Sequence, residues 1–132
     1  MHDRGMTSET LWRGISADLG FWTAAGAIGA VLSVPISDAI GVRPLWFAVG
    51  AAGLAVAAAA LFVGLNRRRP VSRQLVWSFA AGNLALAPVV WLAVFLGWLP
   101  LTPAGKWGLA ACADVMLVLG LYQLYTLRRQ PA

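Results

Sequence analysis

Four stretches of nearly continuous apolar residues alternate along the chain with short segments rich in proline, glycine and charge. An apolar segment of about 20 residues can cross the hydrocarbon core of a bilayer as an α-helix. The pattern therefore predicts four transmembrane helices, over residues 15–34, 45–65, 75–99 and 106–127. The segments between them read "PISDAIGVRP" (35–44), "NRRRPVSR" (66–73) and "PLTPAG" (100–105), and such compositions are typical of turns and connections.

The second stretch, 45–65, contains no charged residue and is rich in alanine and glycine. Helices in lipid associate through close backbone contact at small residues. We therefore expect this helix either at the centre of the bundle or packed against a second copy of the chain. The expected fold is all-α, with four transmembrane helices in a compact bundle that forms a single domain over residues 1–132.

The positive charges are distributed unevenly along this pattern, which predicts an orientation. One side of the expected bundle carries Arg4, Arg13, Arg67, Arg68, Arg69, Arg73, Arg128 and Arg129, and the other carries Arg43 and Lys106. The positive-inside rule then places both termini in the cytoplasm and the chain in the cytoplasmic (inner) membrane as a multi-pass protein. The net charge of +5 is thus assigned to a membrane surface, and nucleic acid is not an expected partner.

The same arginines predict a contact with membrane lipids. Arg67, Arg68, Arg69 and Arg73 lie together between the second and third stretches, and each would attract anionic headgroups by about 1 kcal/mol. The alternative is that these residues only set the orientation.

Composition excludes several classes of chemistry. Hydrophobic residues make up 60% of the chain, too much for the core of a soluble domain of this size. The single cysteine, Cys112, excludes an intrachain disulfide and a multi-thiolate metal site. The one histidine, His2, is close to the terminus, which argues against Ser-His-Asp catalysis, zinc hydrolysis or histidine-ligated haem within one chain. No metal and no cofactor are expected.

Three polar residues are predicted to share one depth in the membrane. Counting 1.5 Å per helical residue from the outer boundary places Asp18, Asn83 and Gln123 roughly 22–25 Å inward, near the cytoplasmic face. They belong to three different predicted helices. One interpretation is interhelical hydrogen bonding, with Asp18 wet or close to Arg13 or Arg73. The other is a ligand or proton site.

Asp114 stands alone in the segment "GLAACADVMLVLGLY" (108–122), where every other residue is uncharged. It is expected about 10 Å from the outer boundary, level with Trp91 and with no cation at that depth. The indole N–H of Trp91 is the available donor if the third and fourth helices face each other there. An intramembrane acid is a functional candidate by default, and a purely structural hydrogen bond is the alternative. Trp22 and Trp91 could line an apolar pocket.

These residues support three hypotheses of function. The first is an apolar site centred on Asp114 that binds a lipid or another hydrophobic small molecule, or an accessory subunit with the same architecture. The second is a cofactor-independent enzyme in which Asp114 is the catalytic acid for isomerisation, cyclisation or epoxide opening of a lipophilic terpenoid or polyketide. The third is a proton-coupled small-molecule exporter that works as a homodimer. The candidate ligand-binding residues are Asp114, Trp91, Asn83, Asp18, Gln123 and Trp22.

The second half of the chain resembles a loose group of small bacterial four-helix integral membrane proteins of unassigned function. The resemblance rests on Asn83 early in the third helix, the turn "PLTPAG" (100–105), and Gln123 followed by the pair Arg128 and Arg129. It implies the four-helix architecture and no particular activity. Asp114 is not part of the pattern.

Overall fold

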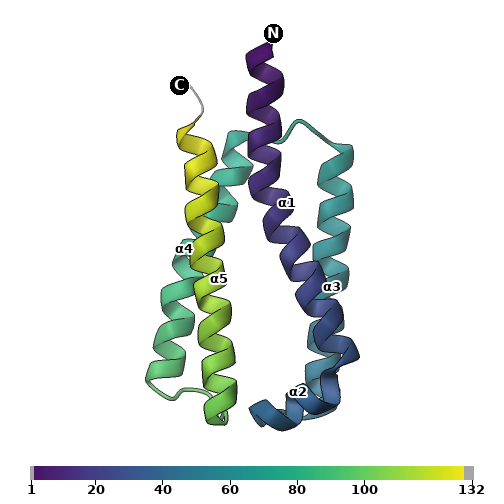
Figure 1. Ribbon diagram of the computed structural model, residues 1–132, viewed down its shortest axis with the longest axis vertical. Helices are drawn as coiled ribbons and strands as arrows, with labels where there is room; N and C mark the ends of the chain where they lie inside the picture. The colour runs from purple at the N-terminus through teal and green to yellow at the C-terminus, as the bar shows by residue number, and fades with distance from the viewer. Residues whose placement is uncertain (1, 130–132) are drawn as a thin grey trace.

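The computed structural model describes residues 2–129, with side chains described from residue 9 onward, and the regular secondary structure of this part of the chain is entirely α-helical, without a strand (Figure 1). The helices are α1 (His2–Val31), α2 (Ser33–Ile40), α3 (Pro44–Arg67), α4 (Arg73–Phe95) and α5 (Pro103–Arg128). The prediction of an all-α fold is confirmed. The described chain has one helix more than expected, because the first predicted span is divided in two.

α3, α4 and α5 are each long and apolar enough to cross a membrane. The first predicted span, 15–34, takes another form, since α1 is followed by α2 after a bend of 91°. The prediction of a simple connection over 35–44 is wrong in part, because residues 35–40 are helical. Pro35 falls in the first turn of α2, where its missing N–H breaks no intrahelical bond. By length and hydropathy, the described residues thus contain three helices able to cross a membrane, or four spans if α1 and α2 together form one bent span.

Local sequence signals account for the helix boundaries. Ser72 and Thr102 cap α4 and α5, accepting hydrogen bonds from the backbone N–H groups of Leu75 and Gly105, at 3.1 Å each. α4 ends at Phe95 rather than near residue 99, and Gly97 then adopts a φ of 68° that only glycine takes readily.

The helices form two hairpin-like pairs, α1 with α3 and α4 with α5, and α1 also contacts α4 and α5. α2 crosses between the pairs, where its last residues accept hydrogen bonds from Thr102 at the start of α5. Figure 1 places the start of α1 and the end of α5 at the same end of the molecule as the α3–α4 connection (68–72), and α2 at the opposite end with the α4–α5 connection. We call the end with the α3–α4 connection the basic end. The arginines that lie there are Arg67, Arg68, Arg69 and Arg73 around the connection, and Arg128 and Arg129 at the end of α5.

α3 lies at the edge of this arrangement, so a central position for it is wrong. Along its length Ala58 is the residue buried in the described structure. α3 packs closely on α1, because a Cβ built on Gly26 of α1 would come within 2.6 Å of the carbonyl oxygen of Ala51 in α3. The rest of its alanine-rich surface faces outward. The Cα atoms of α3 and α4 stay more than 8 Å apart, although the two helices are consecutive and joined by a short connection.

Most of the buried apolar side chains gather near the basic end. They come from α1, the α3–α4 connection and the facing helices, and they are Leu11, Trp12, Ile15, Leu19, Ala58, Val71, Val76 and Leu127. This core fixes the N-terminal half of α1 against α3 and against the α4–α5 pair. The polar residues of α1 that follow the core are therefore held in a defined position.

Candidate functional site

The three polar residues that were predicted at one depth are hydrogen-bonded to one another. Asp18 Oδ2 accepts a hydrogen bond from Asn83 Nδ2 at 2.6 Å and another from Gln123 Nε2 at 2.8 Å. Asn83 Nδ2 also donates to Gln123 Oε1 at 3.1 Å, and Gln123 Nε2 donates to the carbonyl oxygen of Gly14 at 3.2 Å. The prediction from depth is confirmed for these contacts, which join α1, α4 and α5.

The donors of this cluster are fully used, which fixes the orientation of both amides. Gln123 Nε2 faces two acceptors, the Gly14 carbonyl and Asp18, so its oxygen must face Asn83. Asn83 then faces two acceptors as well and must present its nitrogen to them. All four amide N–H groups are engaged. Asp18 Oδ1 and Asn83 Oδ1 receive no hydrogen bond from the described residues.

Asp18 is buried, with 4% of its surface exposed, and it has no cationic neighbour bonded to it in the described chain. Neither arginine that was expected near it forms an ion pair with it: Arg73 Nη1 instead donates to the carbonyl of Leu127 at 3.2 Å. The interpretation of Asp18 as a wet boundary residue is therefore wrong. Its carboxyl group is held inside the protein by neutral amides.

A groove of about 440 Å³ begins at this cluster and runs between α3 and α4, with α1 as its floor. Its polar lining consists of Asp18, Asn83 and Ser78, together with the indole of Trp22. The remaining lining is apolar and consists of Leu19, Leu54, Ala57, Ala58, Leu61, Phe79, Gly82 and Leu86. No arginine or lysine lines it. The groove is thus an apolar cleft between two helices with a carboxyl group on its floor.

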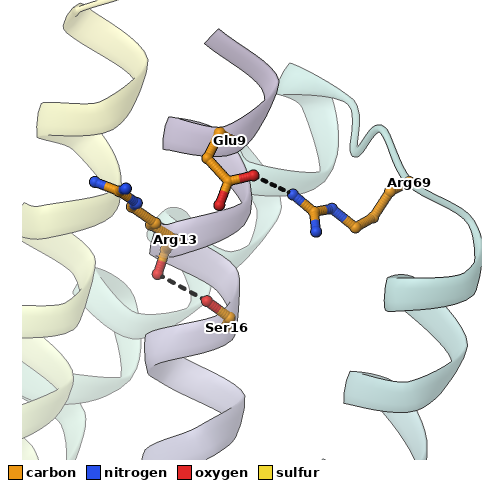
Figure 2. A network of polar contacts seen from close by, with 4 residues as sticks. All are labelled: Glu9, Arg13, Ser16 and Arg69. Atoms are coloured by element: carbon orange, nitrogen blue, oxygen red, sulfur yellow. Dashed lines mark hydrogen bonds and ion pairs between the residues drawn. The ribbon is translucent and has the colours of Figure 1, made fainter. Parts of the chain in front are cut away.

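An ion pair spans α1 and the α3–α4 connection at the basic end. Arg69 Nη2 lies 2.6 Å from Glu9 Oε2 (Figure 2). The Arg69 guanidinium also lies 5.0 Å from the ring centre of Trp12. Arg13 points away from Glu9, and its carbonyl oxygen accepts a hydrogen bond from Ser16 at 3.3 Å. These contacts hold the connection against α1, above the buried core. Both partners of the pair are partly exposed, so it contributes at most about 1 kcal/mol.

Asp114 lies on the surface of α5 and is exposed. Its Oδ1 accepts a hydrogen bond from Trp91 Nε1 at 3.1 Å, so the expected bond between the two helices is present. Trp91 also lines a second cavity, of about 510 Å³, with Leu84, Pro88 and Leu117 among the other lining residues. The structure therefore places Asp114 and Trp91 together, but apart from the cluster of Asp18, Asn83 and Gln123.

Sequence reasoning identified Asp18, Asn83 and Trp22 but missed the other groove residues. Ser78 gives no signal in the sequence, because a serine near the end of a membrane helix is usually solvated. The α3 wall was missed because its alanines and leucines look the same whether they line a groove or face lipid. Gln123, the third member of the cluster, is fully buried and does not line the groove. Within residues 2–129, no three metal-ligating side chains come together.

No family model, no curated protein and no solved structure matches the chain. Any function assigned to the candidate site is therefore argued from the geometry of its own residues.

We expect the Asp114–Trp91 contact to be a weak structural bond. Trp91→Phe removes the donor and should lower the free energy of unfolding by about 0.6 kcal/mol, the usual size of an interhelical hydrogen bond in a membrane. Asp114→Asn keeps an oxygen acceptor and should change it by less than about 0.5 kcal/mol. Reversible unfolding in mixed micelles measures both. A loss of several kcal/mol in Asp114→Asn would contradict this and support a larger role for the carboxylate.

Proposed function

We propose that this is a membrane protein that binds a lipid or another hydrophobic small molecule in the groove between α3 and α4. The observation that carries the proposal is the buried carboxyl group of Asp18 on the floor of an otherwise apolar groove. Small-molecule sites are typically apolar clefts of about 300–1,000 Å³ with a few converging polar groups. At about 440 Å³, the groove has that size and composition.

The way the helices pack supports this location. The backbones of two consecutive helices stay apart, and apolar side chains of both line the open space between them. α1 lies between them and supplies the floor, while the core near Trp12 and Val71 lies toward the basic end. An apolar molecule would reach such a groove from the side, out of the bilayer. A polar head group would then come to rest beside Asp18 and Asn83.

This proposal moves the centre of the predicted site from Asp114 to Asp18. Asp114 lines neither the groove nor the cavity beside Trp91, and its carboxyl group is exposed. Catalysis by Asp114 on a lipophilic terpenoid or polyketide stays a prediction, without a second acid nearby to support it. A role for the protein as an accessory subunit likewise stays a prediction.

A second candidate function is proton-coupled export by a homodimer. One observation favours it: Asp18 is a buried intramembrane acid with which no described arginine or lysine forms an ion pair, and such acids are typical of transport pathways. Binding at the same groove would be the first step of such transport. The second copy would complete the pathway that one small bundle lacks.

Contact with anionic lipid headgroups at the basic end is a separate part of the proposal. Arg69 and Arg73 are already engaged with Glu9 and the Leu127 carbonyl, which leaves Arg67 and Arg68 as the residues best placed for headgroups. Both are exposed. These contacts would hold the protein at its expected orientation with the termini in the cytoplasm.

Filling the groove should abolish binding without disturbing the fold. A Cβ added at Gly82, in the groove wall, meets no atom within 4 Å, so Gly82→Leu places its side chain in the open groove. Gly108→Leu on α5 is the matched control, since Gly108 also has open space but lies outside the groove. Native mass spectrometry of protein released gently from the membrane should find a small molecule on the wild type and on Gly108→Leu, and none on Gly82→Leu.

Two results would contradict the proposal. One is equal retention of the molecule by both glycine variants, which would place it elsewhere. The other is a wild-type protein without any bound molecule, both in mild detergent and in lipid nanodiscs made from the native membrane.

A further inference from the structure

We infer that the groove selects an amphiphile whose head group is a primary ammonium, with one alkyl chain lying between α3 and α4. This rests on the proposed function, and it names the ligand class of that same site. The reason is the balance of donors and acceptors at the polar end of the groove. The hydrogen bonds within the cluster use its N–H donors and leave two of its oxygens free, while the apolar groove walls supply neither donors nor acceptors.

The polar end of the groove offers oxygens that are free to accept. Asp18 Oδ1 and Asn83 Oδ1 accept no hydrogen bond from a described residue. The two side chains are joined through their other atoms, since Asn83 Nδ2 donates to Asp18 Oδ2 at 2.6 Å. Both side chains line the groove. Ser78 also lines the groove, but it donates its hydroxyl hydrogen to the carbonyl of Gln74 at 3.0 Å and so has no donor left for a ligand. A head group that fits must therefore bring donors.

Donors for an acceptor head group are almost absent. The four N–H groups of Asn83 and Gln123 are used inside the cluster. Trp22, one helical turn beyond Asp18, supplies the one indole N–H of the lining for which the described residues provide no acceptor. A single neutral donor does not offset the repulsion between a carboxylate and an anionic head group. Carboxylate and phosphate head groups are thus disfavoured.

Charge leads to the same ligand. Asp18 is buried without a cation, and burying an unpaired charge is costly unless it gains a partner. An ammonium group supplies that partner and carries three N–H donors, of which two match the free oxygens of Asp18 and Asn83. The ring of Trp22 adds a face on which a cation is attracted. The apolar walls beyond Trp22 then take the alkyl chain.

The test uses three probes with the same twelve-carbon chain: dodecylammonium, dodecyltrimethylammonium and dodecanoate. Their affinities are measured for the protein in phosphatidylcholine nanodiscs, with empty nanodiscs subtracted. Wild-type protein should bind dodecylammonium at least about tenfold more tightly than either other probe, because a hydrogen bond to a charged group is worth roughly 1.5–3 kcal/mol. Equal binding of the trimethylammonium probe would overturn the requirement for N–H donors.

Asp18→Asn is the decisive variant, because it keeps the fold. The oxygen of asparagine can accept from both Asn83 and Gln123, while its nitrogen replaces the free Oδ1 and the charge is lost. The preference for dodecylammonium over dodecanoate should fall by about tenfold or more. Asp114→Asn removes the same charge outside the groove and should leave the preference unchanged. An unchanged preference in Asp18→Asn would contradict the inference.

Gly82→Leu separates failure of this inference from failure of the proposed function. If the groove is not a binding site, filling it will leave the binding of every probe unchanged. If the groove binds but selects another head group, Gly82→Leu will abolish binding, yet wild-type protein will bind dodecanoate as well as dodecylammonium. Only the pattern with loss in Gly82→Leu and loss of preference in Asp18→Asn supports both.

Discussion

Gly26→Leu is expected to lower the free energy of unfolding by about 3 kcal/mol, whereas Gly20→Leu on the same helix should change it little. Gly26 lies where α1 and α3 approach most closely. A Cβ at this position would stand 2.6 Å from the carbonyl oxygen of Ala51 and 2.7 Å from the backbone nitrogen of Ala55. Backbone atoms cannot yield as a side chain can, so the two helices must separate.

Separation of α1 from α3 has a large effect because little else holds α3. Helices in lipid gain their stability from close packing rather than from the removal of water, and a wider gap loses those contacts along the whole interface. The backbone of α3 does not approach that of α4, so no close helix–helix contact there would compensate. The floor of the groove would also shift relative to its α3 wall. We therefore expect Gly26→Leu to weaken ligand binding as well as stability.

Gly20→Leu is the control, since a Cβ at Gly20 meets nothing within 4 Å. Both variants make the same chemical change in α1, so helix propensity affects them equally. Unfolding followed by the fluorescence of the tryptophans in mixed micelles gives both free energies. Equal values for the two variants would show that the α1–α3 approach is not a stabilising contact.

Gln123→Leu should lower the free energy of unfolding by about 2 kcal/mol, the second largest effect that we expect. Gln123 is fully buried and makes three hydrogen bonds, to Gly14, Asp18 and Asn83, each worth about 0.6 kcal/mol in a membrane. Leucine has a similar volume, so the loss comes from the bonds and from the acceptors left without a donor. The Asp18 carboxyl group would keep Asn83 as its remaining partner.

Gln74→Leu is the matched control for this variant. Gln74 is exposed near the start of α4, and in the described structure its side chain makes no hydrogen bond, so the same substitution there should have little effect. The measurement is the same unfolding titration. A loss below about 0.5 kcal/mol in Gln123→Leu would mean that the cluster is held by the packing around it rather than by its hydrogen bonds.

Counting along the helices was enough to predict which polar residues meet. Asp18, Asn83 and Gln123 were placed at one depth by the rise per residue alone, and they are bonded to one another. The same count paired Trp91 with Asp114. Depth is a coordinate along the helix axis, and the sequence contains it directly. The two predictions hold because neighbouring helices in a membrane protein run nearly parallel to a common axis.

The sequence did not reveal which way each residue faces. Asp114 and Asp18 are both isolated acids in apolar segments, yet Asp18 is buried and Asp114 is exposed. In a soluble helix, the alternation of polar and apolar residues marks the inner face. In lipid, the inner and outer faces are both apolar, so this signal is absent. The same limit explains why α3 was expected at the centre, although it lies at the edge.

What the sequence by itself determined is the helical class, the approximate bounds of α3, α4 and α5, the concentration of arginines near particular helix ends, and the position of each polar group along its helix. These follow from local propensity, from the length of apolar runs and from a fixed rise per residue. Only the tertiary structure decided that α1 lies between α3 and α4, that α2 turns away at 91°, and that a groove begins at Asp18. Those features depend on which small residues of one helix meet which backbone of another, and such contacts join positions far apart in the chain.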